Sequence, residues 1–178
     1  MVLSINPVKP LFLFFYESVC LHDSNGLAKV KINNKWGFLN LLGEEIIPPI
    51  YDATEFFRDG LLKVCQHSKW GFVNAEGKVI VHLQYDWAWE FSEGLAIVRN
   101  GDKHGAINRN GEEVVPLTYH FMKPFSNGLS ATKQGQKWGY VNARGTLQIP
   151  FTYDDVWSFK NGTAQVIIGS EFSYVSFI

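Results

Sequence analysis

Apolar and polar residues alternate over short stretches of this chain, and turn residues separate the stretches. Residues 27–32 begin apolar and then alternate, as is typical of a strand with one buried face. Residues 33–34 are two asparagines, which tolerate left-handed backbone and predict a turn, and residues 36–41 then return as a partner strand. No stretch shows an apolar spacing of 3.6 residues between helix caps, so the chain is predicted to be all-β.

The same pattern recurs along the chain at a constant interval. Lys-Trp-Gly-Phe-x-Asn at residues 35–40 returns every 34 residues, weakened at 103–108 and almost lost at 171–176. Three other series keep the same step: Gly26, Gly60, Gly94, Gly128 and Gly162; Gly43, Gly77, Gly111 and Gly145; and Tyr51, Tyr85, Tyr119 and Tyr153. A constant period of this length indicates a repeat protein built from copies of one small module.

Each module has room for four short strands. In the first, the third strand is predicted at residues 45–47 and ends at Pro48, because proline cannot sit in the middle of a sheet. The fourth is predicted at residues 51–56, with Asp52 capping a local turn. The whole chain, 1–178, is then a single repeat domain with units at 23–56, 57–90, 91–124, 125–158, and a split unit made of 159–178 plus 8–22.

The split unit suggests how the repeats are arranged. Residues 159–178 match the front half of a unit, and residues 11–19 resemble the back half. Strands from both termini could then pair and close a ring, which leaves no open sheet edge. We therefore expect a small five-bladed β-propeller closed by both termini, with an open solenoid of β-hairpins as the alternative.

Composition narrows the classes of function. The formal net charge is −1 and no Lys/Arg run occurs, which argues against binding to nucleic acid or to an anionic membrane. No stretch approaches the roughly 20 apolar residues of a membrane span. Cys20 and Cys65 lie at unrelated positions and define neither a disulfide framework nor a metal motif. A reducing, cytoplasmic location is the simpler expectation.

The repeat motif itself resembles a known family. It consists of Gly-Leu-Ala-x-Val, then Lys-Trp-Gly-Phe-x-Asn, Gly, Ile-x-Pro and Tyr-Asp. This series of motifs is similar to the WG-containing repeat family of bacterial proteins, over nearly the whole chain from Phe12 to Phe177. The third unit departs from the motif at His104, and the last departs at Phe172 and Ser173. The resemblance implies β-rich repeats with binding roles and implies no catalytic residue.

Chemistry of other kinds finds little support in the sequence. No His-x-x-x-His, Cys-x-x-Cys, nucleophile-elbow or phosphate-loop motif is present, so we expect no metal, no cofactor and no enzymatic activity. His104 and His120 share a unit and could converge, but His104 fills a tryptophan position and His120 an aspartate position of the repeat. Asp52, Asp86 and Asp154 recur after tyrosine, either as turn residues or as the carboxylates of a hydrolase.

Positions whose residues differ between the repeats are candidates for binding, because the fold does not fix them. Ala53, Trp87, Phe121 and Asp155 share one position, and Glu55, Trp89, Lys123 and Trp157 share another two residues later. Residues two apart on a strand face the same side, so Trp87 and Trp89 are predicted to lie together, as extra core or as a binding surface. The predicted binding residues are Trp87, Trp89, Trp157, Arg58, Arg99 and Lys123. The leading expectation is a protein–protein interaction module, with a carbohydrate-binding propeller and a hydrolase as alternatives.

Overall fold

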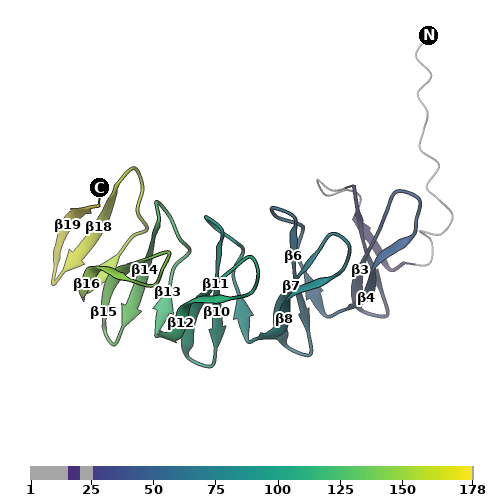
Figure 1. The fold of residues 1–178 in the computed structure, drawn as a ribbon, viewed down its shortest axis with the longest axis horizontal. Coiled ribbons are helices and arrows are strands. Elements are labelled where there is room, and N and C mark those ends of the chain that lie inside the picture. Colours follow the sequence, from purple (N-terminus) through teal and green to yellow (C-terminus); the bar gives the residue numbers. More distant parts are fainter. Residues whose placement is uncertain (1–15, 21–25, 178) are drawn as a thin grey trace, which may run out of the picture. The chain divides into compact units, whose positions relative to one another are not determined.

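The computed structural model describes residues 16–20 and 26–177, and these residues form only strands and turns (Figure 1). Four antiparallel sheets of four strands and one of three follow each other along the chain. The prediction of an all-β protein built from about five repeats is therefore confirmed. No helix in the described part of the chain is long and apolar enough to cross a membrane.

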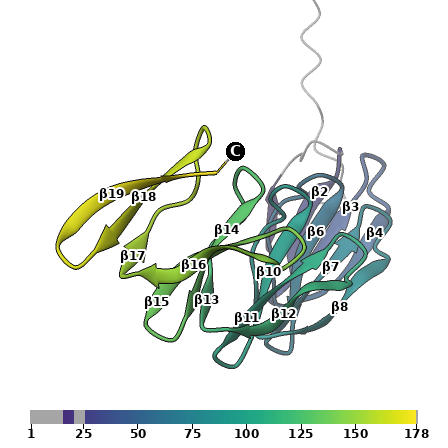
Figure 2. The same ribbon diagram turned by 60° about the vertical axis from the view of Figure 1, so that its left-hand side comes forward.

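The five sheets are numbered here in chain order, and each has four strands except the last, which has three. Sheet 1 contains β1 (Ser18–Cys20), β2 (Ala28–Ile32), β3 (Lys35–Leu39) and β4 (Glu45–Tyr51). Sheet 2 contains β5 (Ala53–Thr54), β6 (Leu61–Gln66), β7 (Lys69–Asn74) and β8 (Val79–Tyr85). Sheet 3 contains β9 (Trp87–Ala88), β10 (Leu95–Asn100), β11 (Lys103–Asn108) and β12 (Glu113–Tyr119). Sheet 4 contains β13 (Phe121–Met122), β14 (Leu129–Gln134), β15 (Lys137–Asn142) and β16 (Leu147–Tyr153). Sheet 5 contains β17 (Asp155–Val156), β18 (Thr163–Ile168) and β19 (Glu171–Ser176), drawn in yellow-green and yellow in Figure 2.

The chain divides into two compact units, which are described separately. Unit 1 comprises Met1–Ser68 and Phe72–Val79, and unit 2 comprises Lys69–Gly71 and Ile80–Ile178. In unit 1 the ring of Phe38 packs edge to face on Phe57, with 5.5 Å between centroids. In unit 2, sheets 3 and 4 bury one apolar cluster between them, and sheets 4 and 5 bury a second cluster. Each sheet of unit 2 therefore depends on its neighbour for its core.

The turn after the Trp-Gly strand explains the recurring Asn and Gly. In β15 the side-chain Oδ1 of Asn142 accepts hydrogen bonds from the backbone N–H groups of Arg144 and Thr146. The N–H of Gly145 donates to the carbonyl of Asn142, and Gly145 has φ +75°. Asparagine supplies the acceptor and glycine the left-handed backbone, so this short turn needs both residues.

The sheets begin at a different point from the predicted units. Residues 51–56 were predicted as one strand, but β4 ends at Tyr51 and β5 begins at Ala53 in the next sheet, where it pairs with β6. The N–H of Asp52 donates to the carbonyl of Cys65, so the chain crosses to the following repeat at this aspartate. The fourth strand of each predicted unit is therefore the first strand of the next sheet.

The same pairing holds at the N-terminus. Residues 18–20, which the split unit assigned to the last repeat, form β1 and pair with β2 of sheet 1. Residues 8–15 and 21–22 of the split unit lie outside the described residues. Closure of a ring by the two termini stays a prediction, and so does the predicted division of the chain into 34-residue repeat units.

The predicted end of a strand at Pro48 is wrong. β4 runs through Pro48 and Pro49 to Tyr51, and Ile47 and Tyr51 pair with Phe38 and Trp36 of β3. β4 is the last strand in the order of its sheet, so the missing N–H groups of the prolines leave no inner ladder bond unmade. Proline is compatible with this strand because the strand is at an edge.

Candidate aromatic binding surface

The Trp-Gly pair of sheets 1 and 4, and His104-Gly105 at the same position of sheet 3, lie at an irregularity between two strands. In sheet 4, Trp138 pairs with Tyr153 and Tyr140 with Ile149, and the register shifts between these pairs. A Cβ placed on Gly139 would lie 2.5 Å from the carbonyl oxygen of Ile149, closer than side chains allow. Glycine therefore permits the close approach of β15 and β16, and the tryptophan before it sits beside the bulge.

Six rings in unit 2 form a continuous series of contacts, which we call the aromatic row. Its members are Trp70, Trp87, Trp89, His104, Phe121 and Trp138. Trp87 packs on Trp70 with 5.1 Å between ring centroids and on Trp89 with 6.1 Å. Trp89 contacts both His104 and Phe121, at 5.6 and 6.3 Å, and Phe121 contacts Trp138 at 5.8 Å. Most of these pairs are edge to face, a favourable geometry for aromatic rings.

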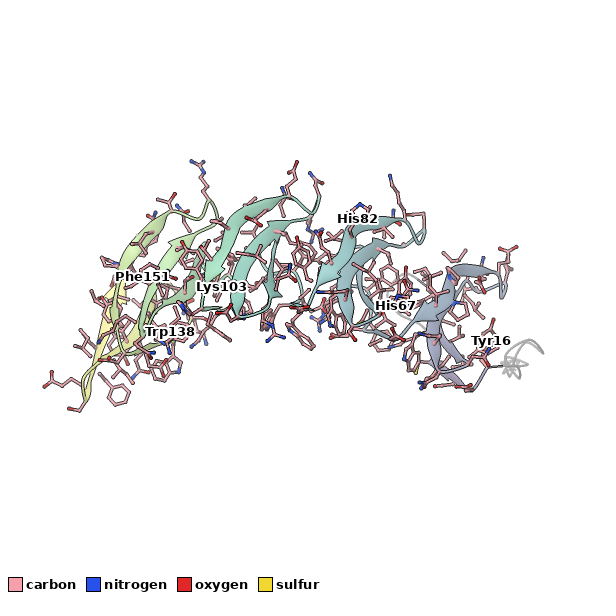
Figure 3. The ribbon with its side chains drawn as sticks, turned by 90° about the horizontal axis from the view of Figure 1, so that it is seen from below. Tyr16, His67, His82, Lys103, Trp138 and Phe151 are labelled. Carbon is pink, nitrogen blue, oxygen red and sulfur yellow. The ribbon has the colours of Figure 1, made fainter. Side chains whose placement is uncertain are left out.

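The aromatic row is only partly covered. Trp87 is 38% exposed and Phe121 37%, whereas Trp89 is half-buried. His104 and Trp138 are buried beneath them (Trp138 is labelled in Figure 3). The buried rings hold the exposed ones in place, so the row presents rigid apolar edges to solvent without the entropy of loose side chains.

Positive groups flank the row at Trp138. The Nζ of Lys123 lies 5.0 Å and that of Lys133 5.7 Å from the centroid of the Trp138 ring, within the range of cation–π attraction. The same Lys123 Nζ donates a 2.6 Å hydrogen bond to the carbonyl of Val156. These two ammonium groups border a pocket of about 400 Å³ that Phe121 and Trp138 also line.

His104 occupies the tryptophan position of its repeat. Its side chain is buried, and its Nδ1 has no hydrogen-bond partner. Burial, and next the positive charge of Arg99, hold the pKa of His104 below its usual value. The ring is therefore neutral near pH 7 and serves as part of the aromatic stack between Trp89 and Phe121.

The recurring aspartates have a structural role. Asp86 accepts hydrogen bonds from Lys69 Nζ at 2.6 Å and from the backbone N–H of Gly101, in the hairpin turn of sheet 3, at 2.7 Å. These bonds lower the pKa of Asp86, the lysine bond most. The same arrangement joins Asp52 to Lys35 and His67, and Asp154 to Lys137 and Gly169.

His120 takes the place of an aspartate in this arrangement. Its Nδ1 accepts the N–H of Gly135 at 3.0 Å, as the aspartates accept a turn N–H in the other sheets. The partner lysine of this repeat, Lys103, instead lies 3.3 Å from Asp102 (Lys103 is labelled in Figure 3). His104 and His120 thus have separate roles, and no group of three or more His, Cys, Asp and Glu suited to a metal occurs among the described residues.

The predicted binding residues are only partly brought together. Trp87 and Trp89 are in contact, Arg99 is paired with Trp87 between β10 and β9, and Lys123 lies over Trp138. Trp157 packs on Phe172 in sheet 5 at 6.5 Å. Arg58 belongs to unit 1, where it forms a bridge with Leu61.

Five members of this surface were missed from the sequence. Trp70, His104 and Trp138 occupy one position of the repeat motif and were interpreted as fold residues. Phe121 shares the position of Trp87 and could have been chosen on that ground. Lys133 carried no signal, because its place over Trp138 depends on the register of β14 and β15.

A protein-family model matches each of the repeats. The WG containing repeat matches the chain five times, at residues 16–36, 36–70, 70–103, 105–138 and 138–171. No curated protein matches the sequence.

Several solved structures share a general likeness with the chain. Hsv2p from Kluyveromyces lactis is 11% identical with a TM-score of 0.48, covering 89% of this chain and 59% of that one. A eukaryotic initiation factor is 12% identical with a TM-score of 0.49, covering 90% and 52%. A protein of unknown function from Bacteroides caccae is 17% identical with a TM-score of 0.33, covering 85% and 69%. The chain spans 55 to 61% of the length of the Hsv2 structures.

The five matches to one repeat follow the sheets in order and together cover most of the described residues. The second to fifth matches each begin at Trp36, Trp70, Gly105 or Trp138 and run to the equivalent strand of the following repeat. This chain therefore belongs to the WG containing repeat family.

Proposed function

We propose that this chain is a non-enzymatic binding module whose aromatic row binds a segment of a partner protein. The observation that carries the proposal is the exposure of Trp87 and Phe121 on a base of packed rings. Tryptophan is enriched among the residues that dominate protein–protein binding, and rigid rings lose little entropy when a partner covers them. Arg99, Lys123 and Lys133 supply a polar margin of the kind that surrounds such surfaces.

The shape of the row favours a polypeptide over a sugar. The ring contacts continue from β7 through sheet 3 to Trp138 in sheet 4, which suits an extended segment. A sugar site would need an open indole face, but Trp87 and Trp89 meet at 79°, edge to face. Trp157, which the carbohydrate alternative also required, is 44% exposed, but its ring contact is with Phe172 in sheet 5 and not with a ring of the aromatic row.

The hydrolase alternative depended on the aspartates that follow each tyrosine. Asp52, Asp86 and Asp154 each already bind a lysine and a turn N–H. A general base needs a carboxylate that faces substrate. Because these carboxylates already hold a lysine and a turn, they favour the binding module over the hydrolase.

The proposal is tested by one substitution on the row and one matched substitution elsewhere. Wild-type protein, Trp87→Lys and Tyr174→Lys are immobilised in equal amounts and exposed to lysate of the source organism, and bound proteins are quantified by mass spectrometry. Tyr174 is 71% exposed on β19, so its change to lysine has the same chemistry away from the row.

We expect Trp87→Lys to reduce capture of the specifically bound protein by about tenfold or more, as a central aromatic contact does. Tyr174→Lys should leave capture unchanged. Circular dichroism shows whether both variants stay folded. Equal capture by wild type and a folded Trp87→Lys would refute the proposal.

A further inference from the structure

The pocket beside Trp138 combines two rings of the aromatic row with two lysine ammonium groups. It has a volume of about 400 Å³, within the range of small-ligand sites. Phe121 and Trp138 provide apolar walls. The complete lining is His120, Phe121, Lys123, Lys133, Gly135, Gln136 and Trp138, with no aspartate or glutamate among these residues.

The ionisable groups of this lining are hydrogen-bond donors. Lys123 and Lys133 carry three N–H donors each, and within residues 16–20 and 26–177 only one donor of Lys123 is used, by the Val156 carbonyl. His120 accepts the Gly135 N–H at Nδ1, so the neutral ring carries its proton on Nε2 and is a donor there. Only the amide of Gln136 can also accept. The side chains of the pocket therefore match an acceptor that carries negative charge.

Nearby carboxylates do not neutralise the two lysines. Asp102 is paired with Lys103, with 3.3 Å between its Oδ2 and the Nζ of that lysine. In the described part of the chain, the salt bridges within 4.0 Å include neither Lys123 nor Lys133. Two ammonium groups thus border a pocket that provides no counter-charge.

We propose that this pocket binds a carboxylate, with the adjoining apolar group of the same ligand against Phe121 and Trp138. The inference rests on the proposed function, because the carboxylate would belong to the partner segment that lies along the aromatic row. An acidic side chain and a free C-terminus share this chemistry. The ammonium groups would form charge-assisted hydrogen bonds to the carboxylate oxygens.

Three capped dipeptides serve as probes. N-acetyl-tryptophanyl-glutamate amide carries a side-chain carboxylate, and its glutamine analogue is the neutral match. N-acetyl-glutaminyl-tryptophan with a free C-terminus carries a terminal carboxylate. Each is titrated into the ¹⁵N-labelled full chain, and dissociation constants are taken from shifts of the Trp138 indole and of backbone N–H groups around residues 133–138.

We expect at least one carboxylate probe to bind about fivefold tighter than the neutral probe, a difference of about 1 kcal/mol. The tighter of the two carboxylate probes identifies the source of the carboxylate. Lys133→Gln should abolish the preference. Lys160→Gln removes the same charge from an exposed residue outside the pocket and should retain the preference.

His120→Asp is a second variant that is expected to fold. Aspartate occupies this position in three other repeats and accepts the same turn N–H there. It keeps the turn bond but adds a negative charge to the pocket, which pairing with Lys103 would offset only in part, so the preference for carboxylate should weaken. Equal binding of charged and neutral probes, absence of any shift at millimolar probe, or an unchanged preference in both variants would overturn the proposal.

The two proposals fail in different ways. If Trp87→Lys reduces partner capture but the probes show no carboxylate preference, the pocket proposal fails and the binding module stands. If the probes show the preference but Trp87→Lys captures the partner normally, the pocket binds carboxylates and the role of the aromatic row is refuted.

Discussion

The glycine of the Trp-Gly position, which follows His104 in the third repeat, is predicted to be intolerant of any side chain. At Gly105 on β11, an added Cβ would lie 2.5 Å from Val115 O, 2.9 Å from Leu117 N and 2.9 Å from Pro116 C. All three are backbone atoms of β12, so no side-chain rotation can relieve the contact. The same approach, at 2.5 to 2.6 Å, recurs at the equivalent positions Gly37, Gly71 and Gly139.

Gly105→Ala should therefore force β11 and β12 apart. Overpacking of a close-packed site costs about 1–3 kcal/mol. For a chain of this size, each kcal/mol lowers the melting temperature by about 2–4 °C, so the expected loss is roughly 2–12 °C. The larger values apply if the bulge cannot adjust.

Gly101→Asn in the same sheet is the matched control. Gly101 has φ +57°, and nothing lies within 4 Å of an added Cβ. Asn33 occupies the equivalent turn position of sheet 1 with φ 48°, so the repeat already accepts this residue there. The control should stay within about 0.5 kcal/mol of wild type.

Thermal and urea denaturation followed by circular dichroism compare the three proteins. The reasoning predicts the order wild type, then Gly101→Asn close to it, then Gly105→Ala clearly lower. A Gly105→Ala protein as stable as wild type would show that the strands separate freely at the bulge, and the physical account of the Trp-Gly pair would be wrong.

Two further predictions concern buried titratable rings. Because the pKa of folded His104 is lowered, the stability of the fold should fall as pH drops below about 6.5, the ordinary histidine value. The melting temperature of His104→Phe should fall less between about pH 7.5 and pH 5 than that of wild type, and an identical loss would contradict the assignment. Tyr140 donates a 2.7 Å hydrogen bond to the carbonyl of Trp157, so Tyr140→Phe should cost about 0.5–1.5 kcal/mol in urea denaturation at pH 7. Burial raises the pKa of Tyr140, so wild type should lose stability as pH rises above about 10, and Tyr140→Phe should lose less; parallel curves would count against this.

Local features of the fold could be predicted from the sequence. The period, the all-β class and the Asn and Gly turns depend on residues within one repeat, where spacing and turn chemistry are visible. The point at which one sheet ends and the next begins was not predicted, because Asp52 bonds to the following repeat. The strand through Pro48 was missed for a related reason, since a sequence does not show which strand is at an edge.

The candidate surface was predictable in part. Comparing equivalent positions singled out Trp87 and Trp89, since the repeat does not require an aromatic residue at either position. The comparison could not reveal that Trp70 and Trp138, which the motif does require, extend the same row. Nor could the comparison show that Trp157 is not part of the row, because its contact with Phe172 depends on the pairing of strands in sheet 5.

The most direct test of the aromatic row is to observe its indoles in a complex. The chain has six tryptophans, so a ¹H–¹⁵N spectrum contains six indole N–H signals that single substitutions can assign. On addition of the captured partner, we predict that the signals of Trp87 and Trp89 shift most, while that of Trp36 on β3 stays in place. Shifts at Trp36 and Trp157 with Trp87 and Trp89 unchanged would contradict the account.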